Sequence, residues 1–394
     1  MTEQVTILFS SWPAYGHLLP MLPLARAAAR AGEEVLISSG ADLTGLIKSR
    51  GFAAHKAGPT LEQSYAAAAT SMAEHGGPTQ FGDLAPEQEM ALAAEYFFGA
   101  AAVARARELL PMMADRRPDL VIHDNMELGA PAAAEILRIP HITHSYGPIV
   151  PGTEEFSDVL GRTLSAADLP DPIHSIFRGS YVDICPPSLQ PTGSSAPWTR
   201  QVALRPAPGE IQPGDELPTG FADLPHPQTI YLTLGTVVNQ RPEVFRAVLA
   251  GCAEHPVNVV TTLGPGVDPA VLGPQPASVL VASYLPQALV LAHCTAVVSH
   301  VGAGTMLGAL CFGLPQLALP QGTDQPFNAA ALVASGAGIA LAPGEITPDA
   351  IAVSLGRLLT ESGIRAQAEA VRAEIAGMPA ADAVLHELLA NVFR

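Results

Sequence analysis

Short apolar runs alternate with helix-like segments along the whole chain. The first two runs, at 5–9 and 34–38, flank an Ala- and Leu-rich segment at 18–31 that Gly32 closes. Short apolar runs bounded by turn residues are typical of strands buried on both faces, whereas the longer segment between them has the pattern of a helix. Strand, helix and strand in this order predict the start of a parallel sheet with right-handed crossovers.

The same alternation continues in two blocks, separated by a stretch rich in proline and glycine at 189–227. That composition is typical of a linker, so we expect two doubly wound α/β domains in tandem. Residues 60–95 have weak periodicity, which favours mobile helices or a long loop. The boundaries that we expect are an N-terminal domain at 1–205, a linker at 206–227, a second domain at 228–375, and a C-terminal helix at 376–394 packing back towards the first domain.

Composition and charge argue against several classes of function. The chain has 394 residues, of which 48% are hydrophobic and 14% charged, as in a globular protein with large cores. Its net charge of −17 argues against a nucleic-acid partner, because phosphate backbones are bound by clustered Lys and Arg. The four cysteines lie far apart without a CxxC spacing, so they indicate neither a zinc site nor a disulfide framework.

The N-terminus and the apolar runs predict where the protein is found. The chain goes from a polar start into a strand, without the basic region and cleavage site of a signal peptide. No run reaches the roughly 18 unbroken apolar residues that a membrane span needs. We therefore expect a cytoplasmic protein without a membrane span. The sequence leaves open whether it is a monomer or a homodimer.

A glycine turn at 300–305 is the first candidate for chemistry. It follows the apolar run at 296–299 and opens a predicted helix, so its backbone N–H groups lie at the positive end of the helix dipole. His300 and Thr305 flank the turn. An anion such as phosphate suits this geometry, but short glycine motifs recur by chance, and a turn that only makes room for helix packing is an equal alternative.

His17 and Asp124 are the second candidate. His17 ends the loop after the first strand, where an imidazole can accept a proton from a substrate hydroxyl. Asp124 ends another strand and could orient that histidine, as carboxylates do in other enzymes, and Glu127 could serve in its place. The competing interpretations are a histidine bonded to backbone and an aspartate that caps the following helix.

Several ligand motifs are missing from the sequence. There is no GxGxxG fingerprint with a downstream acidic residue, and no Walker A lysine. No DxD occurs that could hold a divalent ion bridging a sugar diphosphate, so we expect no metal site.

With both halves in view, the chain resembles the GT-B nucleotide-sugar glycosyltransferases of glycosyltransferase family 1, and more narrowly the bacterial enzymes that glycosylate natural products. Residues 299–305, SHVGAGT, are close to the HGGAGT donor signature, with Val301 in place of its first glycine. Gly16-His17 with Pro20 matches G-H-x-x-P, and residues 118–124 match the strand that bears the acidic partner. The resemblance covers both ends of the chain.

The resemblance implies a fold and a reaction. Two Rossmann-like domains would face a cleft. His17 would deprotonate the acceptor hydroxyl, Asp124 would stabilise the imidazolium, and the sugar would transfer from a TDP- or UDP-sugar with inversion, as in a hexosyltransferase of antibiotic biosynthesis. No cofactor and no metal would be required. The implied donor-binding residues are Gly235, Thr236, Tyr284, Gln287, His300, Gly302, Ala303, Gly304, Thr305, Asp324 and Gln325.

On the acceptor side the resemblance implies a small hydrophobic aglycone such as a polyketide, a macrolide or an aromatic compound. Candidates to line its pocket are Trp12, Tyr15, Phe81 and Tyr146, with 60–95 as a mobile lid. Two alternatives stay open at this point: a nucleotide-sugar epimerase of the same architecture, which would need no acceptor, and a non-catalytic partner of another glycosyltransferase. The sequence does not identify the sugar, the base or the acceptor.

Overall fold

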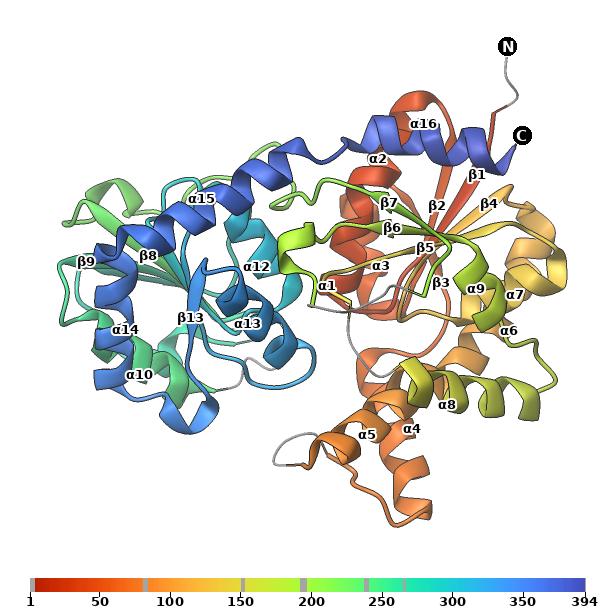
Figure 1. Cartoon of the computed structure of the whole chain (residues 1–394), viewed down its shortest axis with the longest axis horizontal. Helices are drawn as coiled ribbons and strands as arrows, with labels where there is room; N and C mark the ends of the chain where they lie inside the picture. Colours follow the sequence, from red (N-terminus) through yellow and green to blue (C-terminus); the bar gives the residue numbers. More distant parts are fainter. Residues whose placement is uncertain are drawn as a thin grey trace. The chain divides into compact units, whose positions relative to one another are not determined.

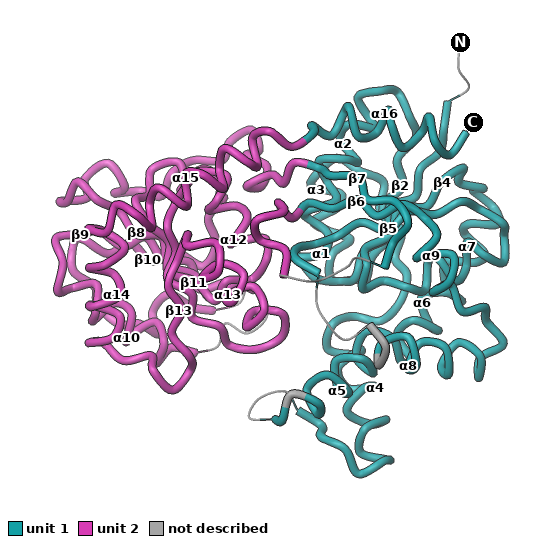
Figure 2. The backbone as a smooth tube through the Cα atoms, in the orientation of Figure 1, with its two compact units in different colours: residues 1–184, 193–204, 379–394 teal, residues 185–192, 205–378 magenta. Residues whose placement is uncertain are grey.

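The structure, a computed structural model, describes residues 4–80, 84–149, 153–191, 197–236, 241–264 and 267–393. The chain divides into two compact units (Figure 2). The first unit comprises Met1–Ile184, Gly193–Leu204 and Pro379–Arg394, and the second comprises Cys185–Thr192 and Arg205–Met378. Each unit contains a parallel sheet with helices around it (Figure 1), which confirms the predicted pair of α/β domains.

Seven parallel strands form the sheet of the first unit, in the order β3-β2-β1-β4-β5-β6-β7. The order reverses between β1 and β4, and ligands of open parallel sheets bind beyond the carboxyl ends of the strands at such a point. The two central strands are largely buried, with apolar residues at the middle of β1 and the start of β4. The strands are β1 (Thr6–Ser10), β2 (Glu34–Ser39), β3 (Ala53–Lys56), β4 (Leu120–Asp124), β5 (His141–His144), β6 (Ser180–Asp183) and β7 (Arg200–Ala203).

The helices of the first unit begin and end at recognisable signals. Gly32, with φ of 91°, ends α2 in the left-handed conformation. The helix α16 packs on α2, and the two are joined by an ion pair of 2.7 Å between Arg30 and Asp382. The helices are α1 (Tyr15–Leu18), α2 (Leu22–Ala31), α3 (Thr44–Ser49), α4 (Leu61–Glu74), α5 (Pro86–Phe98), α6 (Ala100–Arg116), α7 (Gly129–Leu137), α8 (Thr153–Ala166), α9 (Ile173–Arg178) and α16 (Ala381–Val392).

The region of weak periodicity at 60–95 contains helices α4 and α5. A capping box starts α4: the N–H of Gln63 donates to Oγ1 of Thr60 at 3.2 Å, and the N–H of Thr60 donates to Oε1 of Gln63 at 3.0 Å. Proline at the first position starts α5. These caps are local sequence signals, and they define the two helices where the apolar pattern does not.

Six parallel strands form the sheet of the second unit, in the order β10-β9-β8-β11-β12-β13. The order reverses between β8 and β11, which places the loops after these two strands at the switch point. The strands are β8 (Gln228–Thr233), β9 (Val257–Thr262), β10 (Val279–Ala282), β11 (Ala296–Ser299), β12 (Gln316–Ala318) and β13 (Gly338–Ala340). The helices are α10 (Pro242–Cys252), α11 (Gln287–Leu291), α12 (Ala303–Leu310), α13 (Gln325–Ala334), α14 (Pro348–Thr360) and α15 (Ser362–Gly377).

Segments near the expected linker cluster with the second unit. Residues 206–227 belong to it, as do residues 185–192. Two hydrogen bonds join residues at or beside these segments to the end of α15: the N–H of Ser188 donates to Oε1 of Glu374 at 3.1 Å, and Nε of Arg205 donates to the carbonyl of Met378 at 3.0 Å. None of the helices in the described parts of the chain is long and apolar enough to cross a membrane.

Candidate functional site

His17 and Asp124 meet at the switch point of the first sheet. Pairing of β1 with β4 aligns Ser10 with His123, so the loop after β1 lies beside the end of β4. Nδ1 of His17 lies 2.9 Å from Oδ2 of Asp124. The His17 side chain is 12% exposed and that of Asp124 is 1% exposed. Nδ1 is thus the ring nitrogen that contacts Asp124, and Nε2 is not part of this contact.

Asp124 is held as a carboxylate by its surroundings. Its Oδ2 accepts the N–H of Trp12 at 3.1 Å, and its Oδ1 accepts the N–H of Met126 at 3.1 Å. Burial by itself would raise the pKa of Asp124, but the charge and hydrogen bond of His17, with the two backbone N–H groups, lower this pKa below its ordinary value. A buried carboxylate of this kind fixes the tautomer of the imidazole that donates to it.

Glu127, the alternative partner for His17, has other contacts. Its Oε1 accepts the N–H of Ala130 at 3.0 Å at the start of α7, and the same oxygen lies 3.5 Å from Nε of Arg105. Glu127 therefore binds the start of α7, whereas Asp124 is the carboxylate in contact with His17.

Aromatic side chains surround His17. The ring centroid of Tyr146 lies 4.4 Å from that of His17, and the centroid of Phe97 lies 6.0 Å away. Trp12 is only 2% exposed, and its ring contacts those of Tyr96 and Phe97 at centroid distances of 5.2 and 5.0 Å. The histidine thus lies at the edge of a packed aromatic cluster.

The four residues predicted to line an acceptor pocket have different surroundings. Trp12 and Tyr146 are buried, and Tyr15 on α1 is half-buried. Phe81 lies outside the described residues. Their assignment to the acceptor stays a prediction.

The neighbouring histidines are bound inside the protein. Nδ1 of His123 lies 3.0 Å from the carbonyl oxygen of Asp124, and its Nε2 lies 3.2 Å from Oγ1 of Thr143. Nδ1 of His144 lies 2.6 Å from the carbonyl of Ser145. Burial lowers the pKa of His123 to about 3 and that of His144 to about 4. Both imidazoles are therefore neutral at pH 7 and have structural contacts.

His300, directly after β11, lies between two glycines of the second unit. A Cβ atom at either Gly235 or Gly302 would lie 2.5 Å from Nε2 of His300, so both positions need glycine for the ring to fit. Burial lowers the pKa of His300 to about 4, although the charge of Asp324 opposes this. Nδ1 of His300 is buried and has no hydrogen-bond partner among the described residues. A neutral imidazole in this position can donate a hydrogen bond to an anionic oxygen.

The glycine turn opens α12, as the sequence predicted. The N–H of Met306 donates to the carbonyl of Gly302, so the N–H groups of 303–305 lie in the first turn, where a helix provides no carbonyl for them. Gly304 is exposed, and a Cβ there would meet nothing within 4 Å. Packing therefore explains Gly302 but does not explain Gly304, which favours the anion site over the packing turn.

Val301, where the HGGAGT signature has glycine, adopts the left-handed conformation. Its φ is 56° and its side chain is fully buried. This conformation is an outlier for a β-branched residue. Hydrogen bonds hold it: the N–H of Val301 donates to Oγ of Ser299 at 3.0 Å, and Nδ2 of Asn328 donates to the carbonyl of Val301 at 3.1 Å.

Asp324 and Gln325 start α13 and are tied to their neighbours. Oδ2 of Asp324 accepts Nδ2 of Asn328 at 2.7 Å, and its Oδ1 accepts the hydroxyl of Thr323 at 3.0 Å. Oε1 of Gln325 accepts the N–H of Gln321 at 2.7 Å. The sequence analysis missed Asn328, which contacts both the glycine turn and Asp324. Its one signal is a polar amide inside an otherwise apolar helix.

The remaining donor candidates follow the carboxyl ends of strands in the same sheet. Tyr284 is 57% exposed, as a side chain available for stacking would be. Gln287 is the first residue of α11, and its Nε2 is buried without a partner among the described residues. Thr236, in the loop after β8, is exposed.

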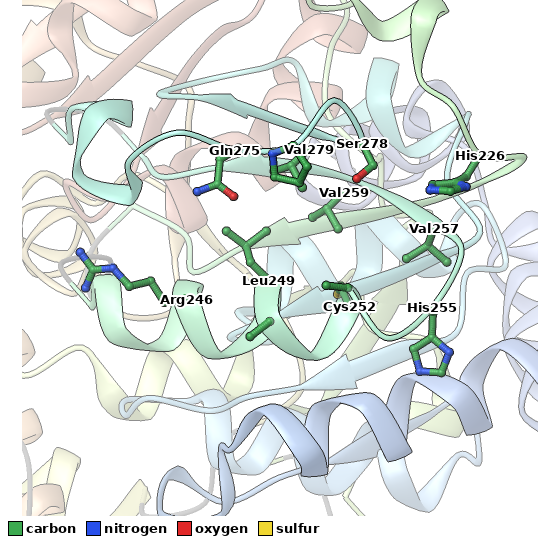
Figure 3. Close-up of a pocket in the computed structure, with 13 residues that line it drawn as sticks. His226, Arg246, Leu249, Cys252, His255, Val257, Val259, Gln275, Ser278 and Val279 are labelled. Atoms are coloured by element: carbon green, nitrogen blue, oxygen red, sulfur yellow. The ribbon is translucent and has the colours of Figure 1, made fainter.

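A separate pocket lies at the other end of this sheet (Figure 3). Its volume is about 470 Å³, and it is reached near the amino ends of β9 and β10, whose first residues are Val257 and Val279. The donor candidates follow the carboxyl ends, so the pocket is not part of their site. The residues that line it are His226, Arg246, Leu249, Ala250, Cys252, Ala253, His255, Val257, Val259, Gln275, Pro276, Ser278 and Val279.

The candidate residues divide between the two units: His17 and Asp124 belong to the first, and the donor candidates belong to the second. In the described parts of both units, no group of three or more His, Cys, Asp or Glu side chains is arranged to hold a metal ion.

Known families and proteins match this chain over most of its length. Models described as Erythromycin biosynthesis protein CIII-like, N-terminal domain and C-terminal domain, match residues 26–204 and 246–390. The L-demethylnoviosyl transferase of Streptomyces niveus is 32% identical over 348 residues, covering 85% of this chain and 84% of that protein. Elloramycin glycosyltransferase ElmGT of Streptomyces olivaceus is 31% identical over 398 residues, covering 95% and 94%.

A solved structure extends the similarity to three dimensions. The spinosyn rhamnosyltransferase SpnG complexed with thymidine diphosphate is 25% identical to this chain and superposes with a TM-score of 0.78. The match covers 98% of this chain and 100% of that chain.

Proposed function

Because this chain belongs to the Erythromycin biosynthesis protein CIII-like family of bacterial natural-product glycosyltransferases, within glycosyltransferase family 1, we propose that it transfers a sugar from a TDP-sugar to a hydroxyl of a polyketide-type aglycone with inversion. The predicted GT-B fold and the glycosyltransferase class are confirmed. The donor, the acceptor, the stereochemistry and the residue roles belong to the proposal.

In the proposed reaction His17 is the general base. Nε2 takes the proton of the acceptor hydroxyl as the acceptor oxygen forms a bond to the anomeric carbon. The bond from that carbon to the diphosphate oxygen breaks, and its electron pair leaves with TDP. Asp124 stabilises the imidazolium that results. A single displacement of this kind inverts the configuration. The observation that carries the proposal is the 2.9 Å contact between His17 and Asp124.

The diphosphate would be stabilised by the glycine turn of the second unit. The first-turn N–H groups of 303–305 and the neutral His300 imidazole donate hydrogen bonds, which strengthen as negative charge develops on the leaving group. Thr236 would add a hydroxyl, and Asp324 and Gln325 would bind sugar hydroxyls. With these donors we propose that no metal is required.

Support for TDP comes from a similar structure, and support for a natural-product acceptor comes from the similar proteins. SpnG was solved with thymidine diphosphate, and the relatives named above are an L-demethylnoviosyl transferase and an elloramycin glycosyltransferase. The rings of Phe97 and Tyr146 beside His17 would offer apolar contacts to an acceptor.

A matrix of TDP- and UDP-sugars against aromatic and macrolide acceptors, read by mass spectrometry, tests the proposal. We expect a glycosylated product with at least one TDP-sugar, and tighter binding of TDP than of UDP by calorimetry. Transfer from UDP-sugars alone would contradict the donor assignment. Absence of binding to both nucleotides would contradict the proposed donor site.

Gly304→Ala separates an anion site from a packing turn. Alanine inside a helix is favoured over glycine, so we expect the free energy of unfolding to rise by about 0.5–1 kcal/mol. The methyl group would keep a phosphate away from the turn, so we expect TDP to bind about tenfold more weakly, as when a hydrogen bond to a charged group is lost. Calorimetry with TDP and thermal unfolding measure the two effects.

The matched control is Gly363→Ala at the start of α15, where a Cβ also meets nothing within 4 Å. This variant should bind TDP as the unmodified protein does. If Gly304→Ala binds TDP equally well, the turn is only a packing feature.

A further inference from the structure

Arg105 of α6 is a buried cation beside the His17–Asp124 pair, and the mechanism above does not use it. It is 1% exposed. Its Nη1 donates to the carbonyl of Ser11 at 2.9 Å, and its Nε lies 3.5 Å from Oε1 of Glu127. Removing a charge from water is costly unless it is paired and hydrogen-bonded, so a buried guanidinium at this place needs a reason.

The surroundings of Arg105 are shaped to admit the guanidinium. Gly58 adopts a φ of 78°, and a Cβ there would lie 2.9 Å from Nε and 3.0 Å from Nη2 of Arg105. At Gly129 a Cβ would lie 2.8 Å from Cβ of Arg105, so α7 approaches α6 closely at the level of this side chain. Larger residues at either glycine would displace the arginine.

One peptide group connects Arg105 to the catalytic pair. The carbonyl of Ser11 accepts Nη1 of Arg105, and the N–H of Trp12, which belongs to the same planar peptide, donates to Oδ2 of Asp124 at 3.1 Å. Oδ2 is also the oxygen that contacts Nδ1 of His17. Oγ of Ser39 donates to the same Ser11 carbonyl at 3.1 Å. Arg105 therefore holds one end of the peptide whose other end holds Asp124.

The charges around Arg105 are almost all negative. Burial lowers the pKa of Arg105, and the carboxylates of Glu127, Asp124, Glu108 and Asp42 oppose this. Glu108, which is also on α6, accepts the N–H of Gly58, and Asp42 accepts the N–H of Leu61. The other titratable groups that face Asp124 are His17, His123 and His144. Burial raises the pKa of Glu127, although the charge of Arg105 opposes this, whereas the pKa of Asp124 is lowered. The guanidinium is thus the cation that faces two fully buried acidic side chains.

We propose that Arg105 is a positioning residue for the transfer reaction: its guanidinium orients the Ser11–Trp12 peptide towards Asp124, and its charge offsets that of the buried Asp124 beside His17. The proposal rests on the proposed function, in which His17 is the base. Arg105 touches neither substrate in this scheme and acts through Asp124.

The test is the pH profile of kcat/KM for the full-length protein and three variants. Loss of a nearby positive charge makes His17 easier to protonate. In Arg105→Met the acid limb should therefore move up by about one pH unit, with kcat at least tenfold lower. Glu127→Gln leaves Arg105 without its nearest carboxylate, so the acid limb of this variant should move down. The amide oxygen can still accept the N–H of Ala130, which preserves the start of α7.

Arg105→Lys separates charge from geometry. Lysine keeps the charge but lacks the fixed fork that reaches Ser11, so the acid limb should stay in place while kcat falls. If Arg105→Met fails to fold, the lysine and glutamine variants alone decide. Calorimetry with TDP should give the same affinity for all variants, because the TDP candidates lie in the other unit.

Two results overturn the proposal. If Glu127→Gln has the same acid limb as the unmodified protein, the role of the charge is contradicted. If Arg105→Lys has the same kcat as the unmodified protein, the orienting role is contradicted. A protein with no acid limb at all contradicts His17 as the base, and with it the proposed function. The two failures are therefore distinguishable.

Discussion

Replacing His17 with alanine is expected to lower kcat by about 10²–10⁴-fold, the usual contribution of a general base. Nδ1 of His17 contacts Asp124, which leaves Nε2 to accept the proton of the acceptor hydroxyl. Without the imidazole, the acceptor oxygen must attack before it loses its proton. The measurement is steady-state turnover with a TDP-sugar and an acceptor, beside calorimetry with TDP.

The TDP affinity of His17→Ala should be unchanged, because the TDP candidates lie in the second unit. His386→Ala is the matched control, since His386 is an exposed residue of α16 in the first unit and should leave kcat as it is. Normal transfer by His17→Ala would remove His17 as the base while leaving the family assignment intact.

Replacing Asp124 with asparagine is expected to lower kcat on the order of 10³-fold or more. The carboxylate accepts hydrogen bonds from His17, Trp12 and Met126. An amide has one oxygen for these donors, and its NH₂ group would face at least one of them. The imidazole would then lose both its fixed tautomer and the charge that stabilises the imidazolium. Turnover is again the measurement.

The control for this substitution is Asp119→Asn. Oδ2 of Asp119, an exposed residue just before β4, accepts the N–H of Thr6, and an amide oxygen can do the same. The control should keep full activity. If Asp124→Asn lost affinity for the donor but kept kcat, Asp124 would not be the partner of the base.

The sequence predicted the central strands around each switch point but missed three of the four strands at the edges of the sheets. Strands β1, β4, β8 and β11 have apolar, buried centres, because both of their faces are covered, and they were expected within a residue or two. The inner strand β6 was missed, whereas β10, at an edge, was expected at 278–282. The edge strands β3, β7 and β13 were also missed. Their sequences, AAHK, RQVA and GIA, are short, and most of their residues are at least partly exposed, so they leave no apolar run.

The sequence predicted the site residues that lie in recognisable motifs. It missed a residue whose position depends on a contact between elements far apart in the sequence. Because β1 pairs with β4, the loop after β1 brings His17 to Asp124 at the end of β4. Arg105 was not singled out, because an arginine in an Ala-rich helix followed by Arg107 and Glu108 has the pattern of a solvated face. Its burial depends on Glu127, which lies in another element, and sequence spacing does not report that contact.

The donor turn shows the same limit. The sequence located the turn and marked Val301 as a departure from the signature. The left-handed backbone of Val301 and its hydrogen bond from Asn328 became visible only in the structure. Asn328 contacts both the turn and Asp324, so it connects two donor segments that the sequence treated separately.

The central claim is an inverting, single-displacement transfer that requires no metal. The most direct measurement is NMR of the product formed from a TDP-sugar of known anomeric configuration and an acceptor, with EDTA present. We predict a product of the opposite anomeric configuration and one TDP released for each sugar transferred. A product that retains the configuration of the donor, or transfer that stops with EDTA and returns with a divalent ion, would contradict this account.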